Sequence, residues 1–296
     1  DWALPVTASA VATKDWAQAL ADIAVAVAQA KGVPAPVAGG TAPAQAQAIA
    51  PALLAGERKA ILLGNAAAHH GHAAQLLALA QWIGEQTGAT VGYLTEAANT
   101  VGAQWVQAQP QKDGKNAGEM LTGAIKAAIL LNTEPAFDAA AGAKGLEQAD
   151  MVITLSPFKA NLDISDVLLP VAPFTETSGT FVNAEGRVQS FHAVVKPLGE
   201  TRPAWKVLRV LANLLELPGF DYESSQDVLT AAIGAETKEV PSALRSNITK
   251  VAAKVPENEA AEPVTASIYQ LDGIVRRATS LQLTADARLA REGGAA

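Results

Sequence analysis

The sequence contains no cysteine among its 296 residues. A disulfide and a thiolate-bound iron–sulfur cluster are therefore excluded within this chain. A structural zinc site would need histidine and carboxylate ligands alone, which is unusual. Long apolar runs are missing as well: the apolar runs are short pieces such as residues 127–131, against the 18 or so residues that indicate a transmembrane helix. We expect no metal centre and no membrane span in this chain.

Aromatic and basic residues are also scarce. Aromatic side chains make up 5% of the chain, and 22 Lys and Arg face 29 Asp and Glu, for a net charge of −7. Phosphate neutralisation needs an excess of Lys and Arg, so nucleic acid is disfavoured as a partner. Alanine, the best helix former, makes up about a fifth of the residues. The length suggests about two domains, or one α/β domain with appendages.

Short apolar runs alternate with helical patterns along most of the chain. Helices are expected at 15–30 and 44–54, between residues 73 and 88, at 136–148, and between Pro203 and Pro218. Strands are expected at 59–64, 90–95, 126–132, 150–156 and 166–172. This alternation predicts an α/β fold, with a mostly parallel, Rossmann-like sheet covered by helices on both faces. The irregular connection after the second strand has no assignment.

The pattern changes after Pro173. A hairpin is expected from strands at 180–182 and 187–194 around a turn at 183–186. Beyond this hairpin and loop region we expect an extended C-terminal segment. The sequence predicts four segments. They are an N-terminal helical segment with a loop (1–57), an α/β domain (58–233), a polar linker (234–263) and a C-terminal docking segment (264–296).

A histidine-rich stretch follows the first expected strand. His69, His70 and His72 suggest a metal site, but no carboxylate or thiol nearby in the sequence completes a ligand set. The glycine spacing of a dinucleotide fingerprint is absent, so a nicotinamide site is disfavoured. Backbone amides at the start of the next helix offer an anion site. We favour a solvated loop that carries histidines.

Other polar groups have equally simple interpretations. Asp163, Glu176 and Glu185 could form a general acid–base set, but acids in turns are usually solvated. The tripeptide at 247–249 fits the glycosylation pattern without a secretory context. Four arginines form a basic end to the chain, where a solvated helix face is favoured over a phosphate site: Arg276, Arg277, Arg288 and Arg291.

The segment 163–212 has a specific resemblance. It is similar to the signature of the molybdopterin oxidoreductase family. The matching positions are 166–170, Glu176, 179–181, Asn183, 185–187, Gln189, 199–200, 202–203 and Trp205. Residues 92–103, 127–138 and 268–284 resemble, within that family, the C-terminal part of the G subunit of bacterial NADH-quinone oxidoreductase, respiratory complex I. Because the sequence begins at Asp1, we expect a fragment of a longer protein.

The resemblance implies a cofactor-poor domain. Iron–sulfur clusters are expected on N-terminal cysteines of the parent protein that this sequence lacks, and the molybdopterin is expected to be lost. No catalytic residue and no metal ligand is assigned. The signature loop is then vestigial, and its members are Glu176, Gly179, Thr180, Asn183, Gly186 and Arg187.

The loop residues have structural roles to play. Gly179 and Gly186 allow a positive φ at the turns, and Asn183 can hydrogen-bond its own turn. Arg187 can pair with Glu176 or Glu185.

The leading hypothesis is a non-catalytic structural domain of the complex I peripheral arm. It would support NADH-to-quinone electron transfer that other regions carry, and would itself be inactive. Its expected partners are the other peripheral-arm subunits and the N-terminal part of its own polypeptide. The expected location is cytoplasmic, at the inner membrane of a bacterium. The alternative is the molybdopterin-binding domain of a formate-dehydrogenase-like oxidoreductase. A third hypothesis is a free nucleotide-binding α/β domain.

Overall fold

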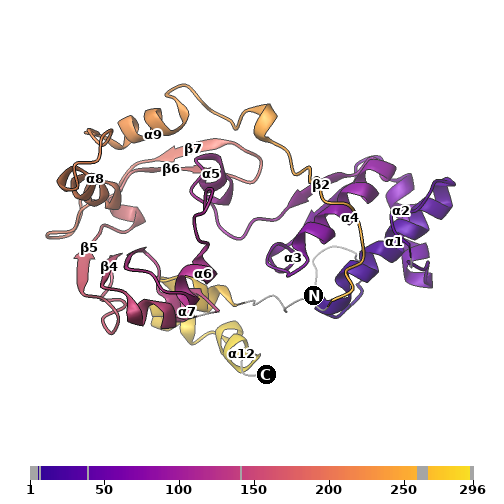
Figure 1. Cartoon of the computed structure of the whole chain (residues 1–296), viewed down its shortest axis with the longest axis horizontal. Coiled ribbons are helices and arrows are strands. Elements are labelled where there is room, and N and C mark those ends of the chain that lie inside the picture. The colour runs from indigo at the N-terminus through magenta and orange to yellow at the C-terminus, as the bar shows by residue number, and fades with distance from the viewer. Residues whose placement is uncertain (1–5, 7, 39, 141, 259–265, 294–296) are drawn as a thin grey trace. The chain divides into compact units, whose positions relative to one another are not determined.

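A computed structural model describes residues 6, 8–38, 40–140, 142–258 and 266–293 of the chain (Figure 1). The chain forms two compact units, which are described separately. The first unit comprises Asp1–Ala97 with Ser242–Thr265, and the second comprises Ala98–Pro241 with Ala266–Ala296. These units divide the chain differently from the four predicted segments, whose boundaries stay predictions. Part of the predicted linker, residues 259–263, lies outside the described residues.

The first unit is a helical layer on a two-stranded parallel sheet. Its strands pair in register from Ala60↔Thr90 to Leu63↔Tyr93. Its elements are α1 (Trp16–Lys31), α2 (Ala44–Ala55), β1 (Ala60–Leu63), α3 (Asn65–Ala68), α4 (Ala73–Thr87) and β2 (Thr90–Tyr93). Helix α1 packs against both α2 and α4, and Val27, Leu79 and Ile83 are fully buried between them. The segment 242–258 is attached through Asn247, the residue of the glycosylation pattern, whose Nδ2 donates to Val91 O at 3.0 Å.

The second unit holds a three-stranded parallel sheet and an antiparallel hairpin. Its strands are β3 (Ala127–Leu131), β4 (Met151–Ser156) and β5 (Val167–Pro170), in the order β3-β4-β5, with the hairpin β6 (Gly179–Val182) and β7 (Val188–Phe191). Its α-helices are α5 (Thr100–Trp105), α6 (Ala117–Thr122), α7 (Pro135–Asp138), α8 (Ala204–Leu214), α9 (Ser225–Ile233), α10 (Ile268–Leu271), α11 (Thr279–Gln282) and α12 (Ala285–Gly293). Short 3₁₀ helices include η2 (Lys144–Gln148), η3 (Phe174–Glu176) and η5 (Val275–Arg277).

The α/β class is confirmed, but the five predicted parallel strands form two sheets rather than one. The connection between β2 and β3 folds into α5 and α6. An Asn116–Glu119 capping box starts α6 and stabilises it locally. The strands are also less covered than predicted, since Leu62 is 56% and Ile129 is 49% exposed.

One predicted helix is interrupted, and one helix that was not predicted is present; local signals explain both differences. The helix predicted at 136–148 stops at Asp138 and resumes only as η2, because Gly142 between them has a left-handed φ of 62°. Helix α9 was not predicted. Its signal was a capping box, in which the side chains and amides of Ser224 and Asp227 hydrogen-bond reciprocally.

None of the helices within the described ranges is both long and apolar enough to cross a membrane.

A glycine inside α4 gives a test of the packing of the first unit. A Cβ on Gly84 would lie 2.6 Å from Val91 Cγ2 and 2.9 Å from Ala89 O. Alanine is normally better than glycine in a helix by about 1 kcal/mol. Here we expect Gly84→Ala to lower the free energy of unfolding by about 1–3 kcal/mol through overpacking, measured by urea denaturation. The matched control is Gly64→Ala, because no atom lies within 4 Å of its Cβ position. A stabilised Gly84→Ala variant would contradict this packing.

Candidate functional site

The family-signature hairpin is held together by its own side chains. Asn183 Oδ1 accepts hydrogen bonds from the amides of Glu185 at 3.1 Å and Arg187 at 2.9 Å. Gly186 has a φ of 85°, a conformation that favours glycine. Across the strands, Thr180 Oγ1 lies 2.9 Å from Ser190 Oγ. The expected turn roles of Asn183 and Gly186 are confirmed.

Gly179 has a different role from the one predicted. It has no positive φ, because it lies in β6, where the backbone is extended. A Cβ at this position would come within 2.6 Å of Phe191 Cζ. Phe191 in turn packs edge-to-face on Phe181, with ring centroids 5.2 Å apart. Glycine is needed here to leave room for an aromatic ring, not to make a turn.

The charged members of the signature are spread apart. Glu176 Oε2 accepts a hydrogen bond from the Leu198 amide at 2.9 Å. Arg187 is exposed, and over the described residues it forms no ion pair with Glu176 or Glu185, so the predicted pairing is wrong. Its backbone instead forms an antiparallel bridge with Glu239. Nor does any hydrogen bond in the described structure join Asp163, Glu176 and Glu185 into an acid–base set.

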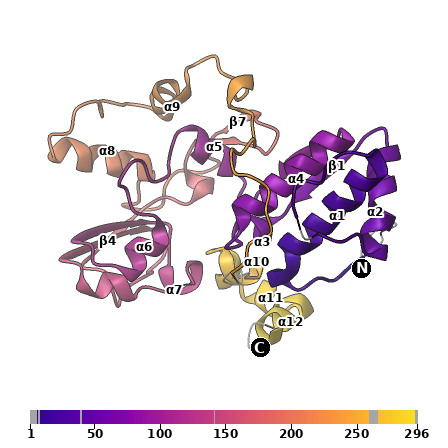
Figure 2. The ribbon, with the colours of Figure 1, turned by 45° about the vertical axis from the view of Figure 1, so that its right-hand side comes forward.

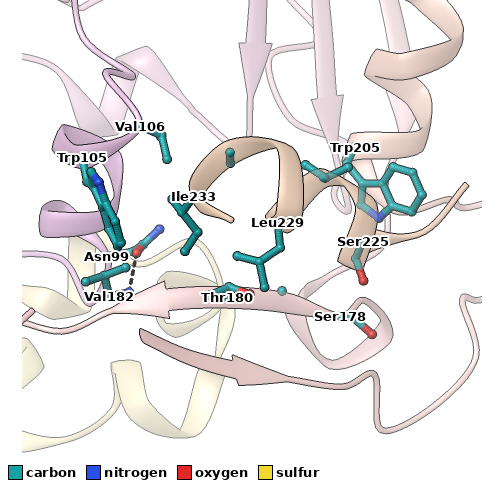
Figure 3. A pocket seen from close by; sticks show the side chains of 14 residues that line it. Asn99, Trp105, Val106, Ser178, Thr180, Val182, Trp205, Ser225, Leu229 and Ile233 are labelled. Carbon is teal, nitrogen blue, oxygen red and sulfur yellow. Dashed lines mark hydrogen bonds between the residues drawn. The ribbon is translucent and has the colours of Figure 1, made fainter. Parts of the chain in front are cut away.

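The hairpin borders an apolar pocket of about 240 Å³ (Figure 3). Helices α5 and α9 form its sides, with Trp105 and Trp205 among the lining residues. Asn99 Oδ1 accepts a hydrogen bond from the Val182 amide at 2.8 Å and so ties β6 to the start of α5. Of the described residues that line the pocket, none is charged. It therefore offers no charged side chain to a phosphate.

The histidine-rich stretch of the first unit is only in part the predicted solvated loop: His69 is exposed, but His70 is buried. His70 is 4% exposed and stacks on Trp16. Its Nδ1 accepts from the His72 amide at 2.9 Å, so its Nε2 carries the proton and donates to Thr13 O at 3.1 Å. His69 lies 3.0 Å from Glu96 Oε2, a carboxylate that sequence reasoning missed. Across the described ranges, no three His, Asp or Glu side chains gather as a metal-ligand set.

A second cavity of about 300 Å³, here called the crevice, lies at the carboxyl ends of β3, β4 and β5. Asn132 follows β3, Ser156 ends β4 and Pro173 follows β5, and all three line it. Open α/β sheets bind ligands at this edge. Another part of the wall comes from the C-terminal residues Leu271–Ile274 and Arg276. Helix α10, which ends at Leu271, lies beside α7 (Figure 2).

Four charged side chains form a cluster, and two of them, Glu134 and Arg276, line the crevice. Arg277 binds Glu134 through two hydrogen bonds of 2.8 Å, from Nη1 to Oε1 and from Nη2 to Oε2. Arg276 Nη2 lies 2.9 Å from Asp138 Oδ1 and 3.5 Å from Glu134 Oε1. The side chains of Glu134 and Arg276 are 10% and 11% exposed. The prediction of a solvated basic face is therefore wrong for these two arginines.

Aromatic rings pack against both guanidinium groups of the cluster. Arg277 Cζ lies 4.2 Å from the centre of the Phe158 ring, and Arg276 Cζ lies 4.9 Å from that of Phe137. The other two arginines of the C-terminal segment differ. Arg288 is exposed, and Arg291 Nη2 donates to Gln282 O at 2.6 Å.

The pKa of Glu134 is lowered from its ordinary value. The main cause is the hydrogen bonding from Arg277, and the positive charges of both arginines add to it, against the opposing effect of burial. Conversely, the hydrogen bonding of Glu134 raises the pKa of Arg277. The pair is thus ionised at neutral pH.

The fold is of the α/β class, with small parallel sheets and an antiparallel hairpin. Residues 44–214 match the molybdopterin oxidoreductase family, and the chain belongs to that family. The expected family is thereby confirmed.

Three relatives illustrate the similarity. A provisionally named formate dehydrogenase of Staphylococcus aureus (strain bovine RF122 / ET3-1) is 39% identical over 77 residues, 26% of this chain and 8% of the relative. The provisionally named oxidoreductase YjgC of Bacillus subtilis (strain 168) is 40% identical over 70 residues, 24% of this chain and 7% of the relative. Another provisionally named formate dehydrogenase, from Staphylococcus aureus (strain MRSA252), is 32% identical over 84 residues, 28% of this chain and 8% of the relative. The chain thus matches less than a tenth of each relative, and none of these three names refers to complex I.

The crevice does not fit the pyrophosphate of a pterin dinucleotide. Such a group needs free cations or amide donors, whereas Arg276 and Arg277 are matched by the carboxylates of Glu134 and Asp138. The buried Nε of Arg276 has no partner among the described residues, but it belongs to a guanidinium already neutralised. Asp272 adds a further negative charge to the lining. We therefore derive no reaction step through such a cofactor in this chain.

The contact between Gly179 and Phe191 gives a second test. We expect Gly179→Val to lower the free energy of unfolding by about 1–3 kcal/mol, because its side chain meets the Phe191 ring. The control is the double variant with Phe191→Ala, since the two positions touch and their effects should not add. Chemical denaturation of the four proteins gives the coupling. Strictly additive effects would show that the ring is not the obstacle.

The Glu134 carboxylate gives a pH-dependent test. Its folded-state pKa lies below the unfolded value of about 4.3. The stabilisation is therefore complete above that value and is lost as the pH falls through the folded-state pKa. We expect Glu134→Gln to cost about 1.5–3 kcal/mol at neutral pH, and the cost should shrink on acidification below about pH 4. Thermal unfolding of both proteins measures it, with Glu147→Gln, an exposed acid, as the control. A cost that stays constant down to pH 3 would contradict the role of this charge.

Proposed function

We propose that the chain is a supporting domain of a formate-dehydrogenase-like molybdopterin oxidoreductase, and that it supplies architecture rather than redox chemistry. The names of the relatives favour this kind of enzyme over complex I. Because each match covers less than a tenth of the relative, the activity belongs to the proposal and not to the comparison. The expected partner is the remainder of its own polypeptide.

One observation carries the supporting role. The polar groups that a cofactor would need are engaged within the chain: the Glu134 carboxylate with Arg277, and the Glu176 carboxylate with the Leu198 amide. The Asn183 amide oxygen is engaged by its own turn. With no cysteine in the sequence, the thiolate ligand common in metal centres cannot come from this chain.

The second candidate is the same role in complex I, as the C-terminal part of its G subunit. The resemblance of residues 92–103, 127–138 and 268–284 to that subunit supports it. The two candidates differ in the electron donor of the parent protein, which is formate in the first and NADH in the second.

The intact parent protein tests the supporting role. We expect Glu176→Gln to leave its turnover within about twofold, because glutamine keeps an oxygen acceptor for the Leu198 amide. Formate-dependent dye reduction and NADH–ferricyanide activity, measured side by side, distinguish the two candidates. We also expect the isolated chain to carry no molybdenum or iron by elemental analysis after dialysis. Loss of turnover in a fully assembled Glu176→Gln protein, or stoichiometric molybdenum in the isolated chain, would refute the proposal.

A further inference from the structure

The C-terminal segment forms part of the wall of the crevice. Residues 267–283 form α10, η5 and α11, and four consecutive residues of this segment, Leu271–Ile274, line the cavity beside the ends of β3 and β4. The position of Gly273 is close enough to Phe158 that a Cβ would lie 3.7 Å from its ring. The segment is therefore in van der Waals range of the loop that follows β4.

The segment is internally braced in a way that suits a preformed cover. Asp272 Oδ1 accepts from the amides of Ile274 and Val275 at 2.9 and 2.8 Å. Gln282 Nε2 donates to Tyr269 O and Val275 O, both at 2.9 Å. These bonds join α10, η5 and α11 into one piece, so it is expected to dock and leave as a unit.

The attachment of the segment is electrostatic and specific. Two guanidinium groups on the segment face two carboxylates, Glu134 and Asp138, at the end of β3 and in α7. Arg276 Nη1 also donates to Gln270 O at 2.9 Å, which orients its side chain from within the segment. Removing one partner would leave the other as a poorly solvated charge, so the pairs are costly to break singly.

We propose that residues 267–283 are a built-in cover of the crevice, held by the ion-pair cluster of Glu134, Asp138, Arg276 and Arg277. The crevice thus receives a segment of its own chain in place of a nucleotide-like ligand. The cover is separable: its release opens the crevice and leaves the three-stranded sheet intact. The inference does not depend on the proposed function, because it concerns one contact within this chain and not the redox chemistry of the parent.

The absence of cysteine allows a direct measurement of access. In the full 296-residue chain, Ser156→Cys places the only thiol in the crevice wall, at a side chain that is 5% exposed. Ala184→Cys, at the exposed hairpin turn, serves as the reference thiol. We expect a maleimide to label Cys at 156 at least about tenfold more slowly than Cys at 184.

Matched double variants then test the cover. Arg276→Gln/Arg277→Gln should speed labelling at 156 about tenfold. The control Lys144→Gln/Arg288→Gln makes the same change of charge at two exposed side chains outside residues 267–283 and should leave the rate unchanged. Hydrogen exchange followed by mass spectrometry checks the separation: amides of 267–283 should exchange faster only in the first variant, while those of β4 stay protected.

Three results would overturn the inference. Labelling at 156 as fast as at 184 in the otherwise unchanged chain would show an open crevice. Unchanged labelling in Arg276→Gln/Arg277→Gln would show that the cluster does not hold the cover. Loss of β4 protection in that variant would show that the cluster holds the sheet itself. None of these results bears on the metal content or electron donor of the parent protein, so the two proposals fail separately.

Discussion

The bidentate ion pair between Arg277 and Glu134 is the interaction on which the crevice at the carboxyl ends of β3, β4 and β5 depends. This side of the sheet is here called the ligand edge. The ion pair joins two positions 143 residues apart in the chain. Buried ion pairs add little net stability over apolar packing, because desolvation offsets much of the attraction. They do specify geometry, since a shifted segment would leave a carboxylate unpaired. We infer that the cluster determines where the C-terminal segment lies. The contacts with Phe137 and Phe158 add the attraction between a cation and an aromatic ring.

Local patterns were sufficient to predict the strands and the hairpin. The predicted strand at 150–156 differs from β4 (Met151–Ser156) by one residue, because an apolar run of this length is typical of a buried strand and too short for an ordinary helix. The division into two sheets could not be predicted, since it depends on how the connection between β2 and β3 folds. Helix α9 was missed although its Ser224–Asp227 capping box is present in the sequence, because hydrophobic periodicity alone does not reveal a helix of nine residues.

The candidate site was predictable only where its residues interact locally. Asn183 and Gly186 act within one turn, so their residue types revealed their roles. Gly179 was misassigned, because a glycine that makes room for Phe191 looks the same in sequence as one that makes a turn. Glu134, the partner of Arg277, could not be predicted from the sequence, since no spacing rule connects residues 143 positions apart. An acid just after a predicted strand, as Glu134 is, was the one available hint of a charge at the ligand edge.

Membership of the molybdopterin oxidoreductase family says more about the fold of this domain than about its chemistry. Function is located in sites, and one fold supports many of them. Whether the ligand edge can bind a phosphate depends on how many of its cations are unpaired, and not on how many cations it contains. Arg276 and Arg277 would make the edge attractive to an anion if Glu134 and Asp138 were absent. With those carboxylates 2.8 and 2.9 Å from the guanidinium groups, the same edge is electrically satisfied by its own chain. An anionic ligand could gain one of these cations only by breaking an ion pair that is ionised at neutral pH.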